Sequence, residues 1–313
     1  MAGNSNFDTL LSTTLANYRS TLTDNVFTAR PLTFKLMEKG RIRMLNGGTK
    51  IVEPLIYGQN DTVGSYSGFD TIALTPQTGI SAAEYEWKQY AASISMSGIE
   101  EAKNNGEQEI INLLEAKIMQ AEESLREGFN QMFFADGTGN GGKDWNGLAN
   151  LVEATGAVGG IDPADSGNSF WASYEENTST ALTLAQMSTA YNSVSVGNDH
   201  PDVLLTTQTL FEKYEALLLP VLRYTDSKTA DAGFQNLLFK SAPVMYDVHC
   251  PSGVFFFLNS KYITLVGHSG KWFQQTEFIR PEDLDARYAL IMCYGNMTLR
   301  NRAKQGKLTA KTA

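Results

Sequence analysis

Apolar residues recur at intervals of three and four along one long segment of the chain. They form a single stripe between Glu107 and about Ala135: Ile110, Leu114, Ile118, Ala121, Leu125, Phe129 and Met132. This period is typical of a helix that buries one face. At 1.5 Å per residue the predicted helix is about 43 Å long, whereas helices in globular domains average about 11–12 residues. With Asn105 and Gln108 as a possible capping box and Gly137 as a stop, we interpret it as a structural spine.

A shorter stripe lies within the first thirty residues, at Phe7, Leu11, Leu15, Tyr18 and Leu22. Ser, Thr and Asn surround these positions, so the segment is too polar to form a core alone. It predicts an amphipathic arm that rests on its own body or on a neighbour. After Pro31, the stretch "LTFKLMEKG" predicts a short helix that ends at Gly40.

An unusual hairpin is predicted next, from strands at Thr49–Gly58 and Ala83–Gly98. In the second strand the apolar positions change phase near Lys88, which indicates a bulge or a strong twist. The connection between these strands, Gln59 to Ala82, is about 24 residues long and rich in Gly, Ser and Thr. Compact domains rarely carry so long a connection without a purpose. We therefore expect the hairpin to reach a partner.

The remainder mixes helices and strands without a regular βαβ alternation, which predicts an α+β fold. Residues 183–220 read as helix, turn, buried strand and helix. Strands then follow at "APVMYDV", "GVFFFLN", "KYITLVG" and "RYALIMCYGNMTLRN". The run Phe255–Phe257 is continuous and apolar, as in a strand that is covered on both faces.

Composition and charge restrict the function. The chain has 313 residues, 42% of them hydrophobic, with no apolar run near the roughly 20 residues of a membrane span. The start "AGNSNFDTLL" has neither the basic region nor the apolar core of a secretion signal, and two cysteines are too few for a disulfide framework. We therefore expect synthesis in a reducing cytoplasm. A net charge of −9 argues against a general nucleic-acid binder. Only the tail "LRNRAKQGKLTAKTA" is basic, and we interpret it as a solvated end.

The sequence offers several motifs that resemble catalytic or binding sites, but none in a suitable context. "GTGNGGKD" (residues 137–144) satisfies the phosphate-loop pattern, yet it follows the C-terminus of the long helix, where the dipole repels anions. Asp144 stands where that motif needs Ser or Thr. The group Asp247, His249 and Cys250 has no second cluster with zinc spacing. We expect no catalytic residues, no metal and no cofactor.

The order of these parts resembles the major capsid proteins of tailed bacteriophages, which have the Hong Kong 97-type fold. The resemblance covers nearly the whole chain and rests on stretches that are individually weak but specific in their order. These stretches are "DNVFTARPLTFKLMEKGRIRMLNGGTKIVEP", "DGTGNGGKDWNGLANLVE", "SFWASYEENTSTALTLAQMSTAY" through "DVLLTTQTLFEKYEALL", and "FKSAPVMYDVHCPSGVFFFLNSKYITLV".

The resemblance implies a division of the chain. Its parts would be an N-terminal arm (1–30), the start of a peripheral domain (31–48), an extended hairpin or E-loop (49–98), the peripheral domain with the spine helix (99–144), an axial domain (145–245), and peripheral return strands with the basic tail (246–313). Phe255–Phe257 would then lie in a peripheral strand between the spine helix and neighbouring layers. Two departures are expected. No large scaffolding segment precedes the arm, and the hairpin tip has no lysine for covalent linking.

The implied function is a shell subunit that forms hexamers and pentamers in the icosahedral head of a tailed phage around double-stranded DNA. Such a protein is not an enzyme; it would be assembled in the bacterial cytoplasm and located in the virion. Its partners would be itself, a separate scaffolding protein, a portal and cement proteins, with weak DNA contact and no membrane. The predicted inter-subunit contacts lie in the arm and at the hairpin tip: Phe7, Leu11, Leu15, Tyr18, Asp61, Tyr66, Phe69 and Asp70. The alternatives are an encapsulin-type compartment with the same fold and protein cargo and, much weaker, a P-loop enzyme.

Overall fold

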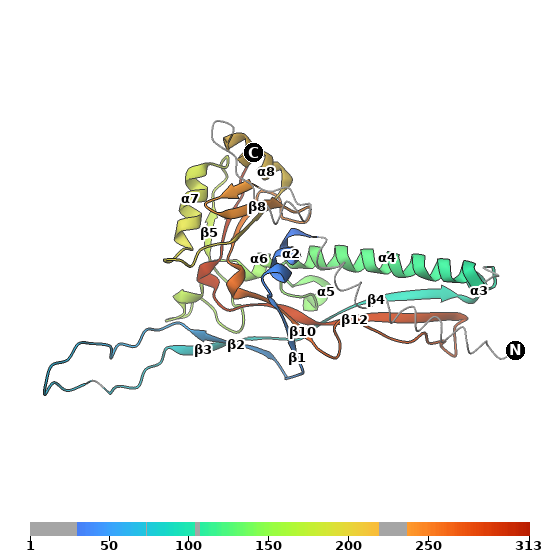
Figure 1. Cartoon of the computed structure of the whole chain (residues 1–313), viewed down its shortest axis with the longest axis horizontal. Helices are drawn as coiled ribbons and strands as arrows, with labels where there is room; N and C mark the ends of the chain where they lie inside the picture. Colours follow the sequence, from blue (N-terminus) through green and yellow to red (C-terminus); the bar gives the residue numbers. More distant parts are fainter. Residues whose placement is uncertain (1–29, 73, 104–106, 219–236) are drawn as a thin grey trace.

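The computed structural model describes residues 30–72, 74–103, 107–218 and 237–313, with backbone alone at 101–103 and 107–115. The arm stripe, the capping box and the side chains of Ile110 and Leu114 therefore lie outside the described residues. The molecule is extended (Figure 1). A two-stranded hairpin projects from one end, a long helix and two long strands run to the other, and a compact lobe stands above the middle.

The helices agree closely with the sequence periodicity. The short helix α2 spans Pro31–Glu38 and is followed by Gly40 with a φ of +62°. The spine helix α4 spans Glu107–Phe134, and its predicted stop Gly137 has a φ of +77°. The remaining helices are α3 (Gly98–Lys103), α5 (Gly139–Gly142), α6 (Leu148–Leu151), α7 (Leu184–Ser193), α8 (Gln208–Leu218), η1 (Ser169–Trp171), η2 (Ser260–Tyr262) and η3 (Arg302–Lys304).

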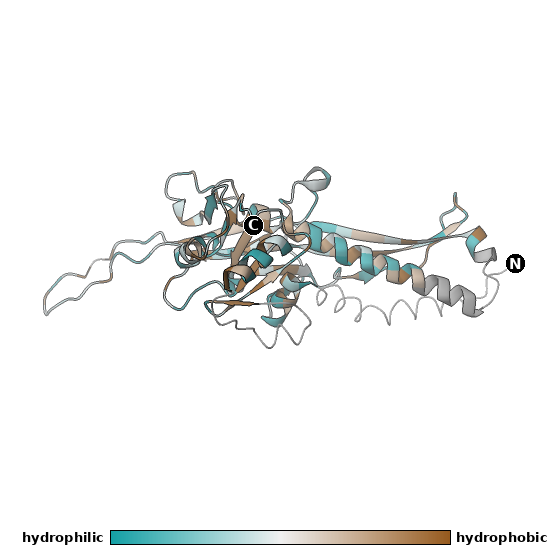
Figure 2. Ribbon diagram, turned by 90° about the horizontal axis from the view of Figure 1, so that it is seen from above, coloured by the Kyte–Doolittle hydropathy of each residue, from teal (hydrophilic) through white to brown (hydrophobic). Residues whose placement is uncertain are grey.

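The spine helix buries the predicted stripe where its side chains are described. Ile118, Leu125 and Phe129 are buried in one core cluster, together with Ala121 and Met132. Seen from above, the helix runs beside the long strands β4 (Lys88–Ser97) and β12 (Ala286–Leu299), and hydrophilic and hydrophobic residues alternate along it (Figure 2). The helix and these strands thus form the two layers of the elongated part of the molecule.

The first sheet joins β1 (Ile42–Leu45), β10 (Ile263–His268), β12 and β11 (Gln274–Gln275), and β4 also pairs with β12. β4 is antiparallel to β12, from Ala286 opposite Ser97 to Gly295 opposite Lys88. This pairing corrects the predicted hairpin. Its second strand is β3 (Ile80–Tyr85), which pairs with β2 (Ile51–Ile56), and β4 belongs to another sheet. The phase change near Lys88 therefore marks the passage of the chain between two sheets.

The second sheet forms the upper lobe and has six strands. Their order is β5 (Tyr174–Asn177), β13 (Gly306–Thr309), β9 (Phe255–Leu258), β6 (Val203–Thr206), β8 (Ala242–Tyr246) and β7 (Leu237–Phe239). The predicted succession of helix, buried strand and helix is confirmed as α7, β6 and α8.

The strand β9 explains why three phenylalanines occur in a row. Phe255 and Phe257 belong to the core cluster of the lobe, whereas Phe256 and Leu258 belong to the cluster around the spine helix. The rings of Phe256 and Phe134 have centroids 6.2 Å apart. The prediction of a strand covered on both faces is confirmed. The domain to which this strand belongs stays a prediction; in the structure β9 lies in the middle of the lobe sheet, between β13 and β6.

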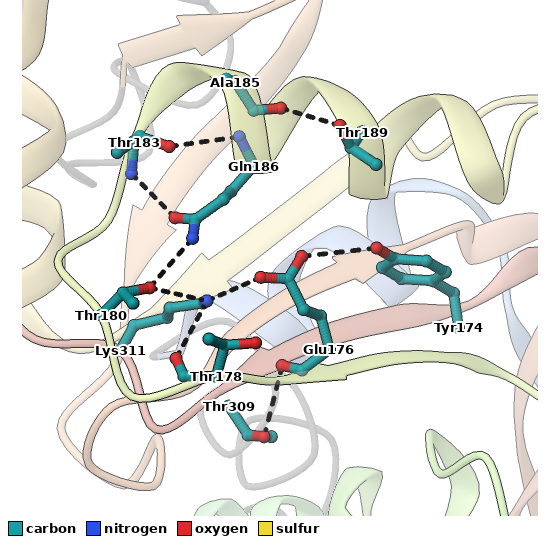
Figure 3. Close-up of polar contacts among 10 residues, drawn as sticks. All are labelled: Tyr174, Glu176, Thr178, Thr180, Thr183, Ala185, Gln186, Thr189, Thr309 and Lys311. Atoms are coloured by element: carbon teal, nitrogen blue, oxygen red, sulfur yellow. Dashed lines mark hydrogen bonds and ion pairs between the residues drawn. The ribbon is translucent and has the colours of Figure 1, made fainter.

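The basic tail is also not a solvated end. β13 pairs with both β5 and β9. The side chain of Lys311 is fully buried, and its Nζ lies 2.9 Å from Glu176 Oε1 and 3.1 Å from the carbonyl of Thr178 (Figure 3). It also reaches Thr180, which accepts a bond from Gln186 in the capping box of α7. Lys311 and Lys307, which pairs with Glu175 of β5, are therefore satisfied inside the lobe.

Candidate assembly surfaces

The hairpin concentrates the exposed apolar surface of the described chain. Nine of its sixteen exposed large hydrophobic residues fall between positions 52 and 80. They are Val52, Ile56, Tyr57, Val63, Tyr66, Phe69, Ile72, Leu74 and Ile80. Monomeric proteins rarely display so much apolar side-chain surface on one projection, and such a surface marks an interaction site.

The predicted contact residues of the tip are exposed, but their side chains do not bond to one another. Phe69 is completely exposed and Tyr66 is 67% exposed. Asp70 Oδ2 accepts the Ser67 N–H at 2.8 Å, and Asp70 N–H donates to the Ser67 carbonyl at 3.1 Å. Asp70 thus shapes the turn that presents Phe69. Asp61 has its N–H 3.2 Å from Gln77 Oε1 on the other limb of the tip.

The root of the hairpin holds residues that the sequence analysis missed. Glu53 on β2 is fully buried and bonds to Arg43, Arg300 and Thr298. Tyr85 on β3 is buried against Leu299. One sequence signal existed: Glu53 alternates with Ile51 and Leu55 on the face of β2 that is buried. A carboxylate on an apolar strand face requires partners.

The described chain begins beside the C-terminal third of the spine helix. Arg30 forms an ion pair with Glu127 of α4, and His249 Nε2 lies 2.5 Å from Glu127 Oε1. A groove of about 330 Å³ lies between α4 and β4, lined in part by Lys117, Gln120 and Ser124. Glu127 follows these three residues at helical spacing, so the junction with the arm lies near one end of the groove.

The residues of the motifs that resemble catalytic sites make contacts within the fold in the described part of the chain. The "GTGNGG" stretch forms a turn after α4, with Asn140 and Gly141 at positive φ, and Asp144 accepts the Asn140 amide at 2.7 Å. Both cysteines are buried and free, and burial raises the pKa of each thiol. No group of three His, Cys, Asp or Glu residues in the described chain could hold a metal ion. None of the described helices is both long and apolar enough to span a bilayer.

Comparison with solved structures identifies the fold. The cyanophage A-1(L) capsid asymmetric unit matches with a TM-score of 0.64 and 16% identity, covering 87% of this chain and 91% of that chain. The capsid of Myoviridae phage XM1 matches with a TM-score of 0.54 and 12% identity, covering 87% and 90%. The SrpI encapsulin complex from Synechococcus elongatus PCC 7942 matches with a TM-score of 0.53 and 10% identity, covering 88% and 87%.

At these identities the likeness shows the fold. Neither a protein-family model nor a curated protein matches the sequence. The resemblance found in the sequence is nevertheless confirmed at the level of architecture: the chain has the α+β, Hong Kong 97-type fold of phage capsid proteins. The SrpI encapsulin complex has the same fold.

Proposed function

We propose that this chain is the major capsid protein of a tailed bacteriophage. It would assemble as hexamers and pentamers into an icosahedral head that encloses double-stranded DNA. The observation that carries the proposal is the hairpin, which projects from the body and holds nine of the sixteen exposed large hydrophobic residues of the described chain. A second copy of the chain would cover this surface, with Tyr66 and Phe69 as apolar anchors.

The two sheets support a division of the subunit into two domains in the shell. The spine helix with the first sheet would form the peripheral domain, and the lobe around the six-stranded sheet would form the axial domain at capsomer centres. In this assignment β9 and β13 belong to the lobe sheet, although they follow residue 245 in the chain. The arm, with Phe7, Leu11, Leu15 and Tyr18, would extend from the junction at Arg30 and Glu127 toward the spine or a neighbour.

The acidic balance of the chain fits a shell that contacts packaged DNA weakly. A net charge of −9 gives little phosphate neutralisation, so the genome could slide during packaging and exit. Assembly would take place in the host cytoplasm, and the protein would then be located in the virion. A separate scaffolding protein, a portal and cement proteins are the further partners this function implies.

Subunit contacts in the shell would be noncovalent. An isopeptide bond requires a neutral lysine, and none lies between Gln59 and Ala82. At the root, a hydrogen bond and the charge of Glu84 raise the pKa of Lys50, which keeps its amine protonated. Lys88 donates to the carbonyl of Gly142. Boiling particles in detergent should give one band near 34.4 kDa, and a multimer ladder that survives reductant would contradict noncovalent assembly.

An encapsulin-type compartment is the second candidate, because the SrpI encapsulin has the same fold. The two functions differ in cargo. Particles from the natural host should be treated with nuclease, purified and extracted. A phage head predicts a protected double-stranded DNA of uniform length. A compartment predicts a co-purifying protein and no protected DNA, and this result would overturn the phage assignment.

A further inference from the structure

Strand pairing does not fix the direction of the hairpin. β2 and β3 form a sheet of their own, and neither belongs to the five-stranded or the six-stranded sheet. Among the residues that the structure describes, a single backbone bond joins β3 to the loop before the lobe, from Glu84 N–H to the Gly159 carbonyl at 2.9 Å. Ile51 and Leu55 pack in the core, but apolar packing is non-directional. Other contacts must set the angle at which the hairpin leaves the body.

Glu53 supplies directional contacts from β2. Its carboxylate is fully buried and accepts a 2.7 Å bond from Arg300 Nε. It also forms an ion pair with Arg43 of β1 and accepts the Thr298 hydroxyl at 3.1 Å. Charge-assisted bonds of this kind are short and geometrically specific. One side chain of the hairpin is thus tied to the first strand and to the end of β12.

Tyr85 supplies equivalent contacts from β3. Its hydroxyl donates to the Leu299 carbonyl at 2.8 Å and accepts the Leu299 N–H at 3.2 Å. Burial raises the pKa of this phenol, so it keeps the proton that it donates. In the hairpin register Tyr85 lies opposite Ile51, one pleat away from Glu53 opposite Ala83. Both strands therefore hold the same three residues, 298–300.

We propose that Glu53 and Tyr85 are the positioning residues of the hairpin. Together they grip residues 298–300 at the end of β12 and set the direction of the tip. Because the tip is far from the root, small rotations matter. The 13 residue-to-residue steps from Ile56 to Phe69 can span up to about 45 Å, so a tilt of about 10° displaces the tip by about 8 Å. In an assembled shell these contacts would position the tip on the neighbouring subunit; this consequence rests on the function proposed above.

The test measures tip position directly in the full chain. Both native cysteines are buried, so spin labels can be placed at Ser67→Cys on the tip and Gln131→Cys on α4, which are exposed positions. Pulsed dipolar spectroscopy then gives the distance distribution between them. We compare Glu53→Gln, which keeps the shape but removes the charge, with Glu84→Gln, which removes an exposed ion pair with Lys50 on the same hairpin.

The wild type and Glu84→Gln should share one narrow distribution, whereas Glu53→Gln should shift or broaden it by several ångström while the thermal transition remains. If Glu53→Gln does not fold, Tyr85→Phe takes its place and should broaden the distribution in the same way. A folded variant with the wild-type distribution overturns the proposal. Particle yield separates the two claims. A wild type that forms no particles refutes the proposed shell function alone, and a displaced tip with normal particles refutes only the link to assembly.

Discussion

Replacing Arg302 by Met should destabilise the subunit more than any exposed charge substitution. The Arg302 side chain is fully buried, and its donors bond to backbone carbonyls of α6 and of the loop that follows it. The shortest contacts run from Nη1 to Gly156 and from Nη2 to Glu153, both at 2.8 Å, and from Nη2 to Thr155 at 3.1 Å. Longer contacts reach Leu151 and Asn150. The guanidinium thus holds this loop in its folded conformation.

The magnitude follows from these contacts. A hydrogen bond to a charged group contributes about 1.5–3 kcal/mol, and a buried carbonyl that loses its donor keeps a desolvation cost. Burial of the Met side chain offsets part of this loss, so we expect a net cost of about 4 kcal/mol. An unfolding entropy of about 2.1 cal/mol/K per residue gives about 0.66 kcal/mol/K for 313 residues. The melting temperature should therefore fall by about 6 °C.

Differential scanning calorimetry at neutral pH measures this shift. The matched control is Arg280→Met, because Arg280 is 59% exposed and pairs with Asp285, which is 69% exposed, and exposed pairs contribute about 0–1 kcal/mol. Arg302→Lys should fall between the two, since an ammonium keeps the charge but reaches fewer carbonyls. An Arg302→Met variant that melts within about 1 °C of the control would refute the interpretation of Arg302 as a loop anchor.

Three further perturbations test other parts of the account. Leu125→Asp should abolish soluble, folded subunits, because an unpaired carboxylate in the core costs several kcal/mol. The control Met119→Asp, at a position 59% exposed on the same helix, should fold normally. Equal melting curves by circular dichroism for the two variants would show that the stripe is not a core face. Deleting residues 1–25 should leave a normal thermal transition but poor assembly by light scattering, and loss of the transition would place the arm in the core. Partial burial raises the pKa of Asp199, but the Tyr262 hydroxyl and other hydrogen bonds outweigh it and lower this pKa below its usual value, so the contribution of Asp199 to stability is present above about pH 4 and is lost in acid. Asp199→Asn should therefore destabilise the protein at neutral pH and match the wild type in stability at low pH. A stability difference that grows in acid would contradict this assignment.

Local periodicity was sufficient to predict the four longer helices, α2, α4, α7 and α8, and most strands, but not the short helices such as α3 and α6. The spine stripe repeats over seven positions, and no other structure buries such a pattern on one face. The hairpin was harder, because only Glu86 and Trp87 separate β3 from β4. Two adjacent strands in different sheets look in sequence like one strand with a defect, and the partner of β4 lies nearly two hundred residues away in β12.

The same limitation explains the errors near the C-terminus. A continuous apolar run such as Phe255–Phe257 indicates burial on both faces but not which strands flank it. Likewise, the number of basic residues in the tail, taken without their partners in the fold, is typical of a solvated chain end. Arg302 and Lys311 are instead buried, and their partners include backbone carbonyls, which carry no sequence signal. The exposed tip was predictable from composition, whereas the grip of Glu53 and Tyr85 at the root depends on long-range contacts.

Electron microscopy of the purified full chain, assembled in vitro or isolated as particles, tests the central claim most directly. The account predicts closed, hollow icosahedral particles in which the hairpin of each subunit lies on an adjacent copy. In the reconstructed map, Tyr66 and Phe69, which are exposed in the single chain, should be covered by a neighbour. A chain that stays monomeric under all assembly conditions, or particles in which the hairpin projects freely into solvent, would contradict the account.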